Sequence, residues 1–279
     1  MVHLKKALTF TVLLLLVFSC LATTAFAVDT RAGVGVYVDG KAFSGNIQVK
    51  NNDTFVGIRK FSTSMDPSAK VTYTSYNRTL TVESHNLYLV AKDGQNYVIA
   101  NGRYLYTPTP VYMKNGVMYA PVSIMARSFG AKYSWDGASS SYKITRGSGG
   151  IVSGDKFYRE DEVYWLSKII YAESGGEPLL GKIAVGNVIL NRARHYYFPN
   201  TIYGVIFDKQ NGVQFSPTAN GTIYKTPNSD SVIAAKICLE GYSVDTSILY
   251  FVNASVVPNS WVVKNRPLYA KIGNHSFYY

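Results

Sequence analysis

The residue best placed to do chemistry in this chain is a glutamate within an apolar helical pattern. Leu166, Ile169 and Ile170 recur at the i, i+3, i+4 spacing of a buried helical face, and Glu173 occupies the next position on that face. The glycine pair 175–176 then supplies a helix stop, so Glu173 should lie in the last turn. The pattern predicts a carboxyl group that points inward.

Two effects would raise the pKa of such a carboxyl group. The last turn of a helix presents the negative end of the helix dipole, and apolar neighbours remove the hydration of a charge. A rise of about 2 units from about 4.3, roughly 2.7 kcal/mol, keeps a glutamate substantially protonated near neutral pH. A protonated carboxyl group is the general acid that glycosidic cleavage needs. The alternative is that Glu173 bends out to solvent and takes no part in chemistry.

The start of the chain predicts export. Lys5 and Lys6 precede an apolar stretch, residues 7–22, and residues 25–27 form a small-x-small cleavage site. We therefore interpret residues 1–27 as a signal peptide, after whose removal no stable membrane span remains. A lipid-modified Cys20 and an uncleaved signal anchor are the alternatives.

The net charge of the sequence indicates which kind of polymer the protein binds. The sequence has 28 Lys and Arg against 17 Asp and Glu, and loss of Lys5 and Lys6 leaves 26 minus 17, or +9. Such a charge favours polyanions, which for an exported protein are the cell wall, a membrane surface or nucleic acid. The basic residues are spread singly and no nucleic-acid module is present, so we expect no nucleic acid and favour the wall. Mere solubility is the alternative reading of the charge.

Cysteine and histidine offer little chemistry. Only Cys238 remains after signal removal, which excludes an intramolecular disulfide, and its apolar segment favours a buried small residue over a nucleophile. The 4 histidines are too scattered for a metal-ligand spacing. We expect neither a metal nor another cofactor.

The first half of the mature chain has the pattern of strands. Short alternating runs are separated by the turn dipeptides Asp39-Gly40, Asp93-Gly94 and Asn115-Gly116, and one helix is indicated over residues 121–129, closed by Gly130. Residues 111–145 resemble the copper amine oxidase N-terminal-like domain of exported bacterial proteins. The similarity rests on Tyr119-Ala120-Pro121, Gly130-Ala131 and Trp135-Asp136.

A weaker first copy of the same unit runs from Val36 to Val82, so residues 28–147 are predicted to contain repeated β-β-α-β-β units. The resemblance implies no copper. It suggests attachment to other wall polymers or to a wall-associated protein, with an inert spacer as the alternative. Residues 148–157, rich in Gly and Ser, are predicted to be a flexible linker.

The second half, residues 158–279, is predicted to be mainly helical. Residues 181–192 are apolar on nearly every side and indicate a buried central helix. Further helices are expected over residues 201–207 and 230–240, and strands over 248–253, 261–264 and 271–278. The predicted fold class is α+β with two domains, the first mainly β and the second mainly helical with a small β region.

Residues 162–279 resemble the catalytic domain of the spore cortex-lytic and cell wall hydrolase family of the SleB and CwlJ type. The similarity is carried by six ordered blocks, among them 170–178, 181–192, 250–253 and 272–278. It differs where Ser174 and Gly175 replace a frequent Ala-Arg pair. The resemblance implies a lysozyme-like fold that cuts peptidoglycan between N-acetylmuramic acid and N-acetylglucosamine, as a lytic transglycosylase with one essential Glu that matches Glu173. It also implies a role in spore cortex or cell wall remodelling. Together with the expected signal peptide, it predicts a secreted location in the cell wall or spore envelope.

Other residues are candidates for contacts with the glycan. The expected substrate-binding residues are polar or aromatic side chains within the matching blocks, namely Ser174, Glu177, Gln214, Ser216, Tyr250, Asn253 and His275. Each also has a structural alternative. For Glu177 the structural alternative is to cap the helix that begins at Pro178. The pattern favours this capping role over substrate binding. A non-catalytic wall-binding protein and a hydrolytic muramidase or glucosaminidase are the competing functions.

Overall fold

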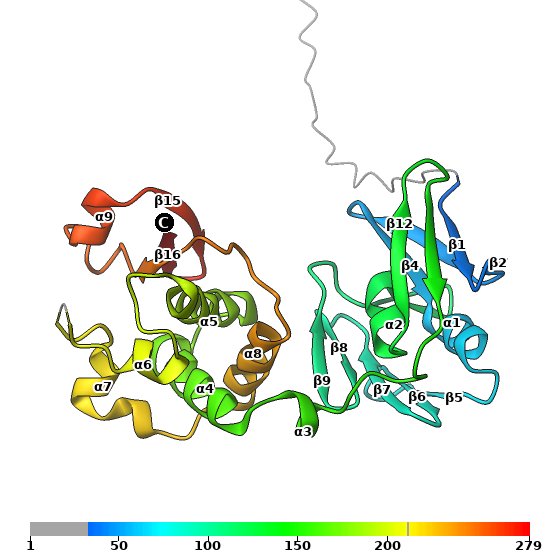
Figure 1. The fold of residues 1–279 in the computed structure, drawn as a ribbon, viewed down its shortest axis with the longest axis horizontal. Coiled ribbons are helices and arrows are strands. Elements are labelled where there is room, and N and C mark those ends of the chain that lie inside the picture. The colour runs from blue at the N-terminus through cyan, green and yellow to red at the C-terminus, as the bar shows by residue number, and fades with distance from the viewer. Residues whose placement is uncertain (1–32, 211) are drawn as a thin grey trace, which may run out of the picture.

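The computed structural model describes residues 33–210 and 212–279, and the predicted signal peptide, residues 1–27, lies outside the described residues. Figure 1 shows two lobes, an N-terminal one of strands with short helices and a C-terminal one of helices with a small sheet. The predicted α+β class is therefore confirmed. Within the described part of the chain, no helix is long and apolar enough to cross a membrane.

The N-terminal lobe is built from hairpins and two helices of its own. Its elements are β1 (Gly35–Val38), β2 (Lys41–Ala42), β3 (Ile47–Lys50), β4 (Asp53–Gly57), α1 (Ile58–Met65), β5 (Lys70–Thr74), β6 (Thr79–Ser84), β7 (Leu87–Lys92), β8 (Tyr97–Ala100), β9 (Arg103–Tyr106), β10 (Tyr112–Lys114), β11 (Val117–Pro121), α2 (Val122–Ser128), β12 (Lys132–Asp136) and β13 (Ser141–Thr145).

The predicted repeat is present in this lobe. The elements β3-β4-α1-β5-β6 and β10-β11-α2-β12-β13 are two copies of one β-β-α-β-β unit, and their first hairpins join in one sheet ordered β10-β11-β4-β3. Two of the three predicted turn dipeptides have the backbone of a two-residue hairpin turn, since both residues of Asp39-Gly40 and of Asn115-Gly116 have positive φ. In Asp93-Gly94 only the glycine has positive φ. Gly130 closes α2 at φ 64°, as predicted.

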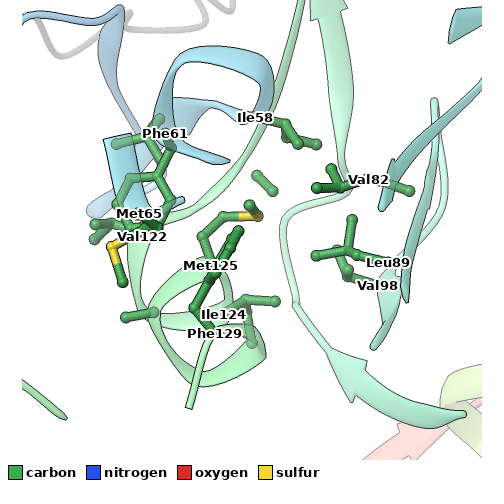
Figure 2. Packing of buried hydrophobic residues seen from close by; sticks show 14 of the residues in the cluster. Ile58, Phe61, Met65, Val82, Leu89, Val98, Val122, Ile124, Met125 and Phe129 are labelled. Atoms are coloured by element: carbon green, nitrogen blue, oxygen red, sulfur yellow. The ribbon is translucent and has the colours of Figure 1, made fainter. Parts of the chain in front are cut away.

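The core of this lobe lies between the two helices and the sheet β5-β6-β7-β8-β9. Figure 2 shows the side chains of α1 and α2 facing those of β6, β7 and β8. The contributing residues are buried and apolar, namely Ile58, Phe61, Met65, Val82, Leu89, Val98, Val122, Ile124, Met125 and Phe129.

The C-terminal lobe surrounds one buried helix. Its elements are α4 (Glu160–Ser174), α5 (Leu179–Arg194), α6 (Ile202–Ile206), α7 (Ser216–Asn220), a 3₁₀ helix η1 (Thr222–Tyr224), α8 (Ser229–Leu239), β14 (Tyr250–Val252), α9 (Trp261–Asn265), β15 (Leu268–Ile272) and β16 (His275–Tyr278). Every residue from Gly181 to Arg192 in α5 is buried, which confirms the predicted central helix. Cys238 is also buried, 1% exposed, as expected of a small core residue.

One predicted strand is wrong. Residues 261–264, expected to be a strand because of their aromatic and β-branched side chains, begin helix α9. The Ser260 hydroxyl accepts a hydrogen bond from the Val263 N–H at 3.4 Å and caps the helix. Local capping therefore outweighs the strand propensity of Val262 and Val263.

The Gly- and Ser-rich segment between the lobes is held in place. It contains the short helix α3 (Gly154–Phe157), and hydrogen bonds join Asn86 Nδ2 to the Ser148 carbonyl at 2.7 Å and Asn101 Nδ2 to the Ile151 carbonyl at 2.8 Å. This segment is therefore not the free spacer that its composition suggests. The domain boundary at residues 148–157 stays a prediction, because β8 and β9 of the first lobe also pack against the core of the second.

A buried ionic network joins the lobes. Arg103 of β9 binds Glu240, which follows α8, through two hydrogen bonds of 2.8 and 2.7 Å. The same carboxylate accepts hydrogen bonds from Arg127 Nη2 at 3.1 Å and from the Tyr158 hydroxyl at 2.6 Å. The side chains of Arg103 and Glu240 are only 8% and 2% exposed. Figure 1 shows β9 facing α8 at this junction.

Candidate active site

Glu173 lies in the last turn of α4, as the sequence predicts. Leu166, Ile169 and Ile170 of the same face are fully buried, and the helix ends at Ser174. Gly175 stops the helix in a different way from the expected left-handed cap, because its φ is −54°. A Cβ atom at this position would lie 2.7 Å from the Tyr171 carbonyl oxygen, so only glycine fits there.

Burial makes Glu173 a weak acid. Its carboxyl group is partly buried, and desolvation raises the pKa of Glu173 to about 7. Among residues 33–210 and 212–279, none forms a hydrogen bond or ion pair with this carboxyl group that would stabilise its charged form. Glu173 can therefore carry a proton near neutral pH and still exchange it.

Glu173 lines an open pocket of about 560 Å³, which we call the glutamate pocket. Its wall comes from the end of α4 and from the segment that contains η1. Lys168 holds that segment against α4, since its buried ammonium group donates to the carbonyls of Tyr224 and Lys225 at 2.9 and 3.0 Å. The polar and charged residues that line the pocket beside Glu173 are Ser174, Glu177, Thr222, Lys225 and Asn228.

Glu177 does not cap the helix that follows it. The first turn of α5 has no side-chain cap, and the Glu177 carboxylate instead accepts hydrogen bonds from Asn274 N–H at 2.8 Å and Asn274 Nδ2 at 2.9 Å. Burial alone would raise the pKa of Glu177, but these hydrogen bonds outweigh it and the pKa is lowered. Gly273, at φ 61°, allows the approach, because a Cβ atom there would collide with Glu177 Oε2. The capping interpretation was wrong: Glu177 holds the β15–β16 turn.

The predicted site residues divide between two places. Ser174 and Glu177 line the glutamate pocket, and Ser174 is buried with its hydroxyl donating to the Ile170 carbonyl at 2.6 Å. Gln214 and Tyr250 line a second pocket of about 830 Å³ at the other end of α5. The remaining three residues line neither pocket.

Two of those three residues, Asn253 and His275, have structural contacts of their own. Ser216 is exposed at the start of α7, and Asn253 Oδ1 accepts a hydrogen bond from the Ser255 N–H at 3.1 Å just after β14. His275 packs against Phe251 with ring centroids 5.3 Å apart. Its buried Nδ1 has no hydrogen-bond partner among the described residues, and desolvation lowers its pKa although Glu177 acts in the opposite direction.

Sequence patterns did not identify several residues that line these pockets. Lys225 and Asn228 reach the glutamate pocket from a loop some fifty residues beyond Glu173, and Trp261 and Arg266 reach the second pocket from around α9. Arg192 had one available signal, because an arginine inside an apolar helical pattern is either paired or functional. Loop residues such as Lys225 carry no comparable periodicity.

We expect wild type to lose stability relative to Glu173→Gln as the pH rises from about 4.5 to about 7. The folded protein keeps the Glu173 proton up to about pH 7, whereas the unfolded chain releases it near its ordinary pKa of 4.5. In this window the folded state binds more protons, so its free energy of unfolding falls with rising pH. Urea denaturation of both proteins across this range measures the difference. A constant difference would show that the pKa of Glu173 is not raised.

The comparisons with known proteins match two parts of the chain to two families. The family described as Cell Wall Hydrolase matches residues 176–278, beginning three residues after Glu173, and the Copper amine oxidase N-terminal domain family matches residues 37–144. A spore cortex-lytic enzyme of Bacillus cereus is 38% identical over 120 residues, which are 43% of this chain and 45% of that protein. The corresponding enzyme of Bacillus subtilis is 32% identical over 43% of this chain and 38% of its own length.

The chain thus spans less than half the length of these curated relatives. The solved catalytic domain of the germination-specific lytic transglycosylase SleB from Bacillus anthracis has 37% sequence identity, covers 44% of this chain and 97% of its own, and superposes with a TM-score of 0.40. The two family matches together account for most of the described residues. The chain therefore contains a copper amine oxidase N-terminal-like domain followed by a cell wall hydrolase domain.

Proposed function

We propose that this protein cleaves the glycan strands of peptidoglycan between N-acetylmuramic acid and N-acetylglucosamine as a lytic transglycosylase. The observation that carries the proposal is Glu173, a partly buried carboxyl group with a pKa raised to about 7 in an open pocket. The match to the cell wall hydrolase family and similarity to spore cortex-lytic enzymes support this substrate.

Glu173 acts first as an acid and then as a base. Its proton passes to the glycosidic oxygen, the bond from that oxygen to C1 of the muramic acid breaks, and positive charge develops at C1. The 6-hydroxyl of the same sugar then attacks C1 and gives its proton to the Glu173 carboxylate. The product is a 1,6-anhydro ring, and Glu173 regains its proton, so the balance needs neither water nor an enzyme nucleophile.

The state of Glu177 favours this one-acid mechanism. Hydrolysis needs a second carboxylate, at about 5–5.5 Å for retention or about 6.5–9.5 Å for inversion, to serve as nucleophile or base. Glu177 is the acid beside Glu173 in the pocket, and both its oxygens accept hydrogen bonds from Asn274. A carboxylate held in this way positions a turn. Ser174, buried against the Ile170 carbonyl, fixes the end of α4 on which Glu173 stands.

The mass of the released fragments tests the reaction. We expect muropeptides with anhydro ends, one water lighter than hydrolysed ends, from purified sacculi incubated with the protein. Hydrated ends would identify a muramidase or glucosaminidase, according to which sugar carries the new reducing end. No release from any sacculus would leave a non-catalytic wall-binding protein.

The same experiment compares the two candidate substrates. We propose that the protein is exported and acts in the spore cortex or cell wall, which its expected signal peptide and its positive charge support. Cortex and vegetative sacculi digested side by side compare the two substrates. Faster release from cortex would agree with the relatives, whose names describe spore cortex lysis.

A further inference from the structure

A second pocket lies at the C-terminal end of α5, between that helix, β14 and α9. It has a volume of about 830 Å³, and its wall combines basic, aromatic and acidic side chains. We call it the arginine pocket, and the residues used below are Arg192, His195, Asp208, Tyr250, Trp261 and Arg266. Glu173 does not line it.

Arg192 is a buried cation without an acidic partner. It is 6% exposed, its Nε donates to the Leu249 carbonyl at 2.7 Å and its Nη1 to Gln214 Oε1 at 3.3 Å. Within residues 33–210 and 212–279, no carboxylate lies at ion-pair distance from its guanidinium group. Desolvation lowers the pKa of Arg192 to about 10, which reflects the cost of this unpaired charge. An anionic group entering the pocket would reduce that cost.

The ring of Tyr250 lies close to both Arg192 and a second arginine, Arg266. The guanidinium carbons of Arg192 and Arg266 lie 5.3 and 4.8 Å from the centre of the Tyr250 ring. Arg266 Nη2 also donates to the Tyr250 hydroxyl at 3.1 Å, and its guanidinium carbon lies 5.0 Å from the Trp261 ring. Both cations are thus oriented by contacts with aromatic rings, which leaves N–H groups that a carboxylate can use.

The remaining charged residue of the pocket limits the charge of its ligand. Asp208 acts on Arg192 at longer range and uses its Oδ1 to accept a hydrogen bond from the Gln210 N–H at 2.9 Å. The two arginines and the aspartate of the pocket together carry a single net positive charge. A monoanionic carboxylate matches this balance better than the repeated phosphates of a teichoic acid.

The arginine pocket is too far from Glu173 to hold the bond that is cleaved. Leu179 begins α5 beside Glu177, and Arg192 lies thirteen residues later, about 20 Å along the helix axis. The small sheet bridges the gap: Glu177 binds Asn274, the next residue His275 contacts Phe251, and Phe251 lines the arginine pocket. A polymer several sugars long is long enough to contact both pockets.

We propose that the arginine pocket binds a carboxylate carried by the peptide stem of the peptidoglycan strand that Glu173 cleaves. This inference rests on the proposed function for the identity of the polymer, and it assigns substrate recognition to Arg192, Arg266 and Tyr250. We expect the contact with the stem carboxylate to be equally strong in the bound substrate and in the transition state. These residues then lower the substrate concentration needed for half-maximal rate and leave the maximal rate unchanged.

Arg266→Gln tests the inference, with Lys264→Gln as its matched control. Arg266 is exposed, so its loss should not unfold the protein, whereas Arg192 also holds the Leu249 carbonyl. Lys264 is an exposed cation of α9 that does not line the pocket. The substrates are sacculi with native stem peptides and the same sacculi after their carboxylates are converted to amides with carbodiimide and ammonia.

For wild type and Lys264→Gln, amidation should raise the half-saturating concentration about tenfold, with the maximal rate unchanged. Arg266→Gln should already have the raised half-saturating concentration on native sacculi, and amidation should change that concentration little. Pelleting of each protein with the sacculi is measured in parallel, so that binding is tested independently of cleavage.

Three other outcomes are informative. If wild type has the same half-saturating concentration on native and on amidated sacculi, the arginine pocket does not bind a carboxylate. The proposed function would remain intact. The effect of Arg266→Gln could instead disappear when teichoic acid is stripped from the sacculi and persist after amidation. That result would identify the ligand as a phosphate instead of a carboxylate, and it would also overturn the proposal. If nothing is cleaved, the proposed function fails, and amide-sensitive pelleting of wild type but not of Arg266→Gln would still support the pocket.

Discussion

Glu173→Gln should reduce the release of soluble muropeptides from sacculi roughly 10³-fold. Glutamine keeps the size of the side chain but cannot donate or accept the proton that the reaction transfers, and general acid catalysis contributes about 10²–10⁴-fold. The pocket should survive the change, because the Glu173 carboxyl group has no hydrogen-bond partner among the described residues to lose. The measurement is the initial rate of muropeptide release, quantified by mass spectrometry, together with pelleting of the variant with sacculi.

Glu162→Gln is the matched control. It makes the same substitution in the first turn of α4, far from the glutamate pocket, and should leave the rate unchanged. Glu177→Gln separates the two enzymatic mechanisms, since it should cost much less than Glu173→Gln if Glu177 only holds the Asn274 turn. An equal loss in both variants would point to a pair of catalytic carboxylates, and an active Glu173→Gln would refute the assignment of the acid.

The position of Glu173 was predictable because its signal is local. The spacing of Leu166, Ile169 and Ile170 defines a helical face, and all three are fully buried in the structure. The same is true of α5, whose residues are apolar around the whole helix, and of the hairpins, whose Asp-Gly and Asn-Gly turns favour positive φ.

The pockets were not predictable because they depend on tertiary contacts. Lys168 binds carbonyls 56 and 57 residues away, and that contact places Lys225 beside Glu173. Nothing in a single sequence fixes such a pairing. The predicted role of Glu177 failed for the same reason, since its partner Asn274 is 97 residues away.

The junction of the lobes shows this limit most clearly. Glu240 follows a helix with Lys236 in its last turn, and no pattern in the sequence marks it as buried. In the structure it is 2% exposed and receives hydrogen bonds from Arg103, Arg127 and Tyr158. Arg103 is 137 residues away in sequence. The composition of the segment between the domains gives no sign of this contact, which depends on residues far apart in the sequence.

We expect Glu240→Gln to lower the free energy of unfolding by about 3–5 kcal/mol. The change leaves the buried Arg103 guanidinium without its charged partner, and removing one member of a buried pair typically costs this much. Part of Arg127 remains solvated at 35% exposure, so Arg127→Gln should cost much less. Urea denaturation of each variant at one pH gives the difference, and Glu160→Gln, an exposed acid of α4, serves as the control for loss of a negative charge.

A double-mutant cycle then isolates the interaction. The double variant Arg103→Met/Glu240→Gln should lose less free energy of unfolding than the two single variants lose together. The reason is that it leaves neither Arg103 nor Glu240 as a buried charge without its partner. Strictly additive losses would show that Arg103 and Glu240 do not interact in solution. Loss of stability confined to one lobe, with the other unfolding as in wild type, would show that the network stabilises a single domain rather than the contact between two.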